Sequence, residues 1–194
     1  MQKLTRADLL SLEQYAADRV RLRAEVIAHK RRRNVPVGPS MTWCFEDRTT
    51  IRYQVQEMLR AERIFEPPGI QGELDAYNPL IPDGNNWKVT LLLEYPDPDV
   101  RREALGKLIG VEDRCWIRVS ELDRVFALAD EDLERENEEK TSAVHFLRFE
   151  LTPSMINAMK SGASLSVGVD HENYRHSVSP LSAPVRDALR ADLD

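Results

Sequence analysis

The stretch Ala143-Val-His-Phe-Leu-Arg-Phe-Glu-Leu151 alternates apolar with other residues, and Leu165-Ser-Val-Gly-Val-Asp-His171 has an apolar parity of the same kind. Side chains of a strand point alternately to its two faces, so each stretch is expected to bury one parity. His145 and His171 both fall on the apolar parity. A half-buried imidazole needs a polar partner, which is another side chain, a metal or a substrate. The two histidines are therefore the first candidates for a functional site.

The relative direction of the two strands decides whether these histidines meet. In antiparallel neighbours with Leu151 opposite Leu165, His145 lies opposite His171, with Cβ atoms about 5 Å apart. Two imidazoles at that spacing can bind one metal ion or one small substrate. In a parallel pair they would be about 20 Å apart. The connecting segment is long enough for either arrangement. The simpler alternative is two unrelated histidines, each hydrogen-bonded to the main chain.

Hydrophobic periodicity predicts two amphipathic helices in the first third of the chain. The first is expected from Thr5 to about His29, and the second from Asp47 or Thr49 to about Phe65. Their expected inner stripes are Leu9, Leu12, Ala16, Val20 and Ile27 in the first helix and Ile51, Val55, Met58 and Phe65 in the second. Further strands are expected at 41–46, 89–95, 115–119 and 124–129, and helices at 99–109, 130–140, 152–162 and from 184.

Strands mixed with short helices, a hairpin and the lack of a glycine-rich phosphate loop indicate an α+β fold with a largely antiparallel sheet. The N-terminal helices are expected to cover that sheet, because their stripes need an apolar partner. We expect a single domain over 1–194, with a helical part and one short strand in 1–65, a sheet-rich part in 87–178 and a C-terminal helix in 184–193. The segment 66–86, rich in Pro and Gly, predicts a long ordered connection with at most one short helix.

Composition narrows the class of protein. The chain has 194 residues, 42% of them hydrophobic, which is enough for one sizeable core. It has neither a long apolar run nor a secretory signal, so we expect a soluble cytoplasmic protein with no membrane segment.

Cys44 and Cys115 are isolated in the sequence and fit reduced, buried thiols. The net charge of −6 is uneven, since residues 1–64 carry 13 Lys and Arg against 8 Asp and Glu. Packing of this basic part on the acidic remainder is the simplest explanation.

A metal site would need carboxylates besides the two imidazoles. Glu62 falls inside the apolar stripe of the second helix, and Glu57 of the same helix is the alternative carboxylate. Together with His145 and His171 they form the candidate ligand set, which suits iron, zinc or manganese. Arg23 falls inside the stripe of the first helix, so an ion pair between Glu62 and Arg23 is the alternative that we favour.

Basic residues form a second candidate site, for an anion. Lys30 and Arg31 belong to a run of four positive charges, and Arg63, Arg148 and Arg175 could add to a phosphate site. No aromatic residue interrupts the run, and base-stacking surfaces normally need one, so nucleic-acid binding is disfavoured. Zinc-protease, calcium-loop and nucleotide-loop signatures are all incomplete in this sequence. Whether the protein is an enzyme is therefore undecided.

The sequence resembles a bacterial domain-of-unknown-function family, family 3501, over nearly its full length. The resemblance rests on segments such as Lys3-Leu-Thr-Arg-Ala-Asp8, Tyr77-Asn-Pro-Leu-Ile-Pro82, Lys140-Thr-Ser-Ala-Val-His-Phe-Leu-Arg148 and Val169-Asp-His171. Genes of that family often lie near those of rubrerythrin-like and iron–sulfur proteins. The resemblance therefore implies an accessory role in iron or peroxide redox metabolism, and it transfers no catalytic residue.

Three functions follow as hypotheses. The first is metal-dependent redox or peroxide handling through His145 and His171, within the oxidative-stress role that the resemblance implies. The second is a non-enzymatic protein that docks on a rubrerythrin-like or iron–sulfur protein through its charged surfaces. The third is phosphate-ligand or nucleic-acid binding through the basic run from Lys30 to Arg33.

Overall fold

The computed structural model describes residues 1–131, 135 and 139–194. Its strands form two sheets, and every pairing between strands of the described residues is antiparallel. The first sheet has the order β1 (Asn34–Pro36), β2 (Met41–Phe45), β3 (Asn86–Leu93), β7 (Val144–Glu150), β6 (Leu128–Ala129). The second sheet has the order β5 (Val125–Phe126), β4 (Cys115–Val119), β8 (Leu165–His171), β9 (Tyr174–Val178). The α+β class and the antiparallel pairing are confirmed, with two sheets where one was expected.

The main core lies between the inner faces of the two sheets. Along β3 the burial alternates, and Trp87, Val89 and Leu91 belong to the same apolar cluster as Ile117 of β4 and Val167 of β8. This alternation follows from the opposite orientation of successive side chains in a strand. The period-2 pattern of the sequence therefore identifies the residues between the sheets.

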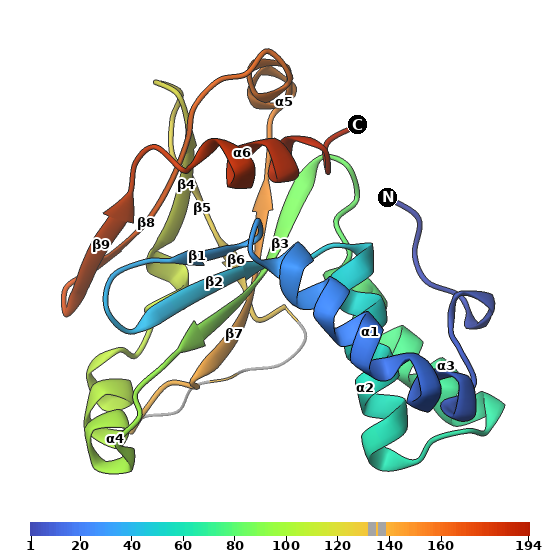
Figure 1. Cartoon of the computed structure of the whole chain (residues 1–194). Coiled ribbons are helices and arrows are strands. Elements are labelled where there is room, and N and C mark those ends of the chain that lie inside the picture. The colour runs from blue at the N-terminus through green and yellow to red at the C-terminus, as the bar shows by residue number, and fades with distance from the viewer. Residues whose placement is uncertain (132–134, 136–138) are drawn as a thin grey trace.

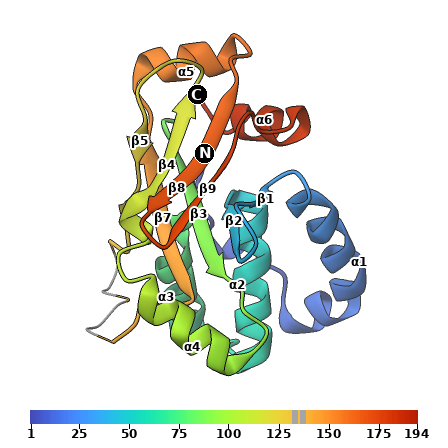
Figure 2. The ribbon, with the colours of Figure 1, turned by 90° about the vertical axis from the view of Figure 1, so that its left-hand side faces the viewer.

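Three helices form a layer beside the first sheet, α1 (Leu12–Lys30), α2 (Arg48–Glu62) and α3 (Pro67–Tyr77) (Figure 1). Ser11 caps α1 by accepting a hydrogen bond from the Gln14 amide, and Asp47 caps α2 in the same way. This layer has an apolar cluster of its own, made of Leu4, Ile51, Val55, Leu59, Leu74 and Ile81. In the turned view, α1 is the outermost of the three helices relative to the sheets (Figure 2).

The first helix differs from its prediction in start and in orientation. A short 3-10 helix, η1 (Arg6–Asp8), occupies the region of the predicted cap at Thr5, and α1 begins only after Ser11. The predicted stripe is wrong, because Val20 is 84% and Ile27 49% exposed, whereas Tyr15 and Val26 are buried. Phe65 is also exposed, because α2 ends at Glu62 and the chain turns away from the stripe.

The predicted connection 66–86 contains an eleven-residue helix, α3, followed by the 3-10 helix η2 (Asn78–Leu80). Pro67 opens α3, and a proline costs nothing in a first helical turn, where the amide has no acceptor. The prolines that suggested a loop therefore mark the start of a helix.

The remaining helices lie at the ends of the sheets. α4 (Pro98–Lys107) lies at one end, and α5 (Pro153–Lys160) and α6 (Ala183–Arg190) lie at the other (Figure 1). Trp87 Nε1 donates a hydrogen bond to the Leu189 carbonyl, 3.0 Å away, and so ties α6 to β3. The helix predicted at 130–140 falls largely outside the described residues.

Among the described helices, none combines the length and the apolar character needed to cross a lipid bilayer.

Candidate functional site

The structure places the two predicted histidines in different sheets. His145 is on β7, between β3 and β6, whereas His171 is on β8, between β4 and β9. The two strands are therefore not neighbours, and the cross-strand histidine pair that an antiparallel contact would create does not exist. Each of the two strands presents its apolar parity to the opposite sheet. The prediction that this parity faces inward was therefore correct, and the expectation that the two strands could pair with each other was wrong.

His171 is held by the main chain. Its Nε2–H donates to the Ile109 carbonyl at 3.1 Å, and its Nδ1 accepts a hydrogen bond from the Asn173 amide at 3.2 Å. Both ring nitrogens of His171 therefore bond to main-chain groups, as expected if the two histidines are unrelated. Arg175 and His171 line a common surface hollow of about 460 Å³.

His145 is completely buried and lies beside two acidic residues. Its Nδ1–H donates to the Asp130 carboxylate at 2.6 Å, and the second Asp130 oxygen accepts from the Phe146 amide at 2.9 Å. Asp130 follows β6 and has a φ of 46°, a left-handed conformation that aspartate adopts more readily than most residues. This backbone turn directs the carboxylate back toward β7.

The other ring nitrogen of His145 faces oxygen atoms. Nε2 lies 3.0 Å from the Thr141 hydroxyl, 3.0 Å from the Ser142 carbonyl and 3.8 Å from a Glu112 carboxylate oxygen. Glu112 belongs to the 3-10 helix η3 (Glu112–Arg114), which precedes β4, and it is only 6% exposed. One ligand atom from each of Glu112, Asp130 and His145 lies within 4.8 Å of the other two. These three residues are called the His145 cluster below.

A basic side chain also contacts this cluster. Arg135 Nε lies 3.1 Å from Asp130, and its guanidinium lies over the Phe146 ring, 4.6 Å from the ring centroid.

Cys115 follows Glu112 by three residues in the sequence. Burial raises the pKa of the Cys115 thiol well above its usual value, and the charge of Glu112 acts in the same direction. Cys115 is therefore a thiol and a weak nucleophile. Cys44 and Cys115 are both buried and free, as predicted.

The other predicted acidic ligands lie in the helical layer, away from either histidine. Glu57 accepts a hydrogen bond from the Tyr15 hydroxyl at 2.6 Å and two from the Arg19 guanidinium. The Arg19 hydrogen bond lowers the pKa of Glu57 to about 2, although burial acts in the opposite direction. Glu62 and Arg23 are both exposed, and Arg19–Glu57 is an ion pair that does join the two helices. The predicted pairing of α1 with α2 through an ion pair therefore occurs with different residues.

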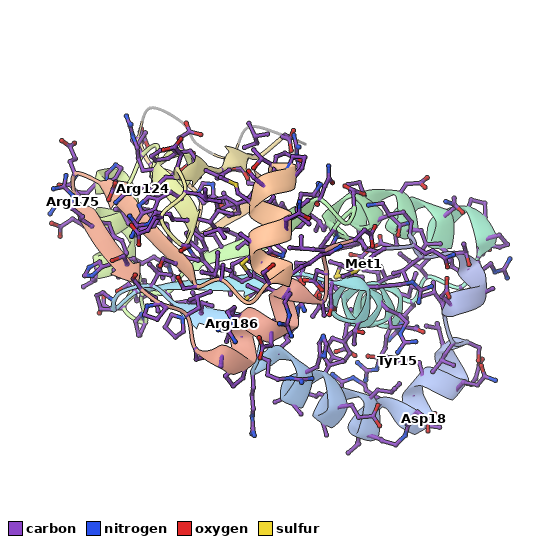
Figure 3. The ribbon with its side chains drawn as sticks, turned by 90° about the horizontal axis from the view of Figure 1, so that it is seen from above. Met1, Tyr15, Asp18, Arg124, Arg175 and Arg186 are labelled. Atoms are coloured by element: carbon purple, nitrogen blue, oxygen red, sulfur yellow. The ribbon has the colours of Figure 1, made fainter. Side chains whose placement is uncertain are left out.

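The predicted anion-binding residues are distributed over the molecule. Lys30 and Arg31 are at the end of α1, Arg63 follows α2, Arg175 is on β9, and Arg148 on β7 is paired with Glu131 and Glu150. Figure 3 shows Arg175 on the side of the molecule opposite the helical layer. The fold therefore brings no more than two of them to one place in the described part of the chain.

Sequence reasoning missed the buried member of the basic run. Arg33 is 3% exposed, donates to the Phe45 carbonyl at 2.9 Å and forms ion pairs with Asp47 and Asp192. Burial raises the pKa of Asp192 to about 6, although Arg33 opposes the shift. His29 Nε2 lies 2.6 Å from Asp47 and extends this network to α1. Arg33 therefore fixes the C-terminus and is not available for an external anion.

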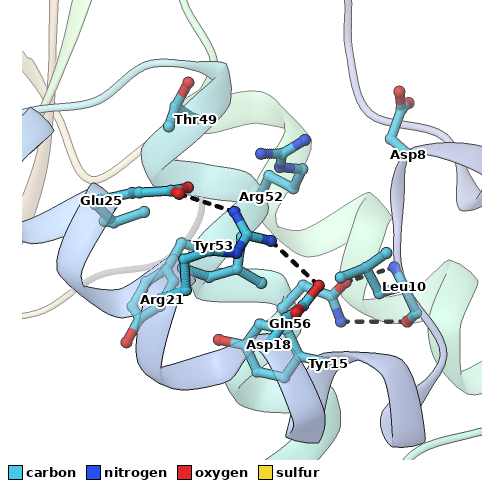
Figure 4. Close-up of a pocket in the computed structure, with 12 residues that line it drawn as sticks. Asp8, Leu10, Tyr15, Asp18, Arg21, Glu25, Thr49, Arg52, Tyr53 and Gln56 are labelled. Carbon is cyan, nitrogen blue, oxygen red and sulfur yellow. Dashed lines mark hydrogen bonds and ion pairs between the residues drawn. The ribbon is translucent and has the colours of Figure 1, made fainter.

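A cavity of about 320 Å³ lies between α1 and α2 (Figure 4). Arg21 projects into it and pairs with Asp18 at 3.1 Å and with Glu25 at 2.8 Å. Gln56 closes one end through hydrogen bonds with the Leu10 main chain. Arg21, Asp18 and Glu25 therefore satisfy one another, whereas Arg52, which also lines the cavity, has no ion pair among the described residues.

Comparisons with known proteins give a family and no activity. The model of the family described as protein of unknown function (DUF3501) matches residues 3–193. A crystal structure of a novel protein of unknown function from Burkholderia pseudomallei is 53% identical in sequence, with a TM-score of 0.95 and coverage of 100% of both chains. No curated protein matches the chain. The chain therefore belongs to the DUF3501 family of proteins of unknown function.

Proposed function

We propose that this protein binds a divalent transition-metal ion at the His145 cluster and acts as an accessory protein in iron or peroxide metabolism. The observation that carries the proposal is the concentration of oxygen atoms around one buried ring nitrogen. His145 Nε2 faces Glu112, Thr141 and Ser142 within 3.8 Å. One imidazole among oxygen donors suits iron, manganese or zinc and does not suit copper(I).

Asp130 and Glu112 would have different roles. The Asp130 carboxylate accepts the Nδ1 proton of His145 and so leaves Nε2 as the ring nitrogen that would bind a metal, in place of its present contact with the Ser142 carbonyl. Glu112 is on the Nε2 side and would bind the metal directly. Metal-ligating histidines commonly have such a carboxylate behind them, and its loss typically weakens metal binding about 10- to 100-fold.

A second reading of the same atoms is a purely structural charge network. Arg135 contacts Asp130 and partly balances the two carboxylates. The two readings differ in the Nε2 proton, since in a network without metal Nε2–H donates to the Ser142 carbonyl and faces the Glu112 carboxylate, whereas a metal ion would take the place of that proton. The metal would need Glu112 as a ligand. Glu112 is therefore the residue to test.

The experiment measures bound metal in protein expressed with supplemented iron, manganese and zinc and purified without chelators. We expect about one ion per chain, lost in Glu112→Gln and reduced in Asp130→Asn. Asp113→Asn is the matched control, because Asp113 is the next residue of η3 and is exposed. Metal content that Glu112→Gln leaves unchanged would contradict the proposal, as would a wild-type protein that holds no metal.

The accessory role in iron or peroxide metabolism is supported by the family resemblance and by the ligand types. Iron is therefore the first metal to load anaerobically. The optical spectrum of the loaded protein before and after addition of hydrogen peroxide would test whether the bound ion changes oxidation state.

A further inference from the structure

A second cavity lies between the helical layer and the first sheet. It has a volume of about 710 Å³ and is bounded by α2, α3 and η2 on one side and by β3 and β7 on the other. Met58, Tyr77, Leu80 and Phe146 supply its apolar lining. Small-molecule sites are typically cavities of roughly 300–1,000 Å³ with mainly apolar walls and a few polar groups.

The cavity is separate from the His145 cluster. Consecutive residues of a strand point to opposite faces, so Phe146 and Arg148 face the helices while His145 and Leu147 face the core. The burial along β7 follows this alternation, with His145, Leu147 and Phe149 buried. The cavity lining at Phe146 and Arg148 and the His145 ring therefore lie on opposite faces of β7.

Two cations lie side by side in the sheet at the cavity wall. Lys88 of β3 and Arg148 of β7 are direct register partners. Like charges in this position repel one another. Arg148 is neutralised by Glu131, which it contacts with two nitrogen atoms, and by Glu150. Among the described residues, no carboxylate contacts Lys88 as closely.

The Lys88 side chain is half-buried, and its charge is weakly compensated among the described residues. Its side chain is 13% exposed, and its one ion pair in the described part of the chain is with Asp83, at 3.9 Å. Asp83 itself is engaged at 2.7 Å by Lys3. Burial lowers the pKa of Lys88 and Arg148 acts in the same direction, whereas Asp83 and Glu131 raise it. A half-buried ammonium whose nearest ion-pair partner is 3.9 Å away is stabilised further when an anion approaches it more closely.

The charge of the cavity limits what that anion can be. Glu73, Asp75 and Glu131 also line the cavity. These acidic groups would repel a doubly charged phosphate, whereas a single negative charge can pair with Lys88 alone. The apolar walls require a hydrocarbon or ring attached to the charged group.

We propose that this cavity binds a small monocarboxylic acid, with its carboxylate on Lys88 Nζ and its apolar body against Met58, Leu80 and Phe146. A charge-assisted hydrogen bond to an ammonium is short and strong, and it would give Lys88 a closer counter-ion than Asp83.

Isothermal titration calorimetry with three probes of equal chain length tests the proposal. Octanoate, octanol and octylamine differ in the charge of the head group and share the apolar tail. We expect octanoate to bind most tightly, and Lys88→Met to weaken octanoate by about tenfold or more while leaving octanol unchanged. Lys107→Met is the matched control, because Lys107 is an exposed lysine of α4.

A second variant locates the ligand. Ala76→Trp places a large side chain in the wall of the cavity, and we expect it to weaken octanoate and octanol alike. The melting temperatures of the unliganded variants show that each is folded. The proposal is overturned if octylamine or octanol binds as tightly as octanoate, if Lys88→Met binds octanoate like the wild type, or if Ala76→Trp leaves its affinity unchanged.

Discussion

Between the two sheets the contacts are apolar, whereas α1 is attached to α2 mainly through polar groups. In the core, Trp43 stacks on Phe149 with ring centroids 5.5 Å apart, and both side chains are fully buried. On α1, Tyr15 and Val26 are the buried residues.

Three polar contacts hold α1 in place. Arg19 and Tyr15 share the Glu57 carboxylate, His29 contacts Asp47, and Gln56 bonds to the main chain of Leu10 just before the helix. Apolar burial stabilises in proportion to area and shows little dependence on pH, whereas ion pairs depend on protonation and salt. The two regions should therefore respond differently to mutation and to acid.

The largest effect is expected from the core. Phe149→Ala removes a buried ring from between the sheets, and we expect the free energy of unfolding to fall by about 3–5 kcal/mol. Phe126→Ala is the control, since Phe126 is 48% exposed on β5. Urea denaturation followed by circular dichroism measures both. Equal losses in the two variants would show that the ring pair is not the centre of the core.

An intermediate, pH-dependent effect is expected at Glu57. Its pKa is about 2 in the folded protein against a reference value of 4.5. The folded state therefore binds the proton less tightly than the unfolded state, so the stabilisation is complete above pH 4.5 and lost as the pH falls toward 2. Because the side chain is a quarter exposed, we expect about 1–2 kcal/mol at pH 7.

Unfolding of Glu57→Gln and wild type between pH 2.5 and 7 measures this difference. The gap in stability should close as the pH falls. Glu62→Gln, an exposed residue of the same helix, should show no such trend. A gap independent of pH would mean that the Arg19–Glu57 pair contributes nothing through its charge.

The smallest effect is expected on the outer face of α1. Ile27→Ser should change the free energy of unfolding by less than about 0.5 kcal/mol, because the side chain is half exposed. Val26→Ala, one residue earlier and buried, should cost more. Sedimentation velocity of the two variants shows whether either substitution changes the oligomeric state. A loss above about 1 kcal/mol in Ile27→Ser would show that another surface covers this face.

Most strands could be predicted because their signal is local. The expected strand at 165–171 coincides with β8, and the hairpin expected from 115–119 and 124–129 corresponds to β4 and β5. After that hairpin the chain crosses to β6 in the other sheet, and the sequence contained no sign of this crossing. The prediction of the buried face of α1 was wrong for a related reason. The spacing of apolar residues does not show whether polar contacts hold a helix in another orientation.

The sequence predicted one residue of the candidate site, His145, and not the acidic residues around it. The parity of β7 placed His145 inside, and the structure agrees. Its neighbours Glu112 and Asp130 could not be found, because they come from η3 and from the turn after β6, which approach β7 only in the folded chain. Lys88 was also missed, because one lysine in an alternating strand normally faces solvent.

The sequence alone determined that the apolar parity of β7 and β8 is buried, where several of the strands lie, and that the thiols are isolated. Only the tertiary structure decided that β7 and β8 belong to different sheets, which face of α1 is outward, and which acidic groups surround His145. The physical reason is that side-chain direction is set by adjacent backbone bonds. Partner choice instead depends on contacts between distant segments, which share no pattern along the chain.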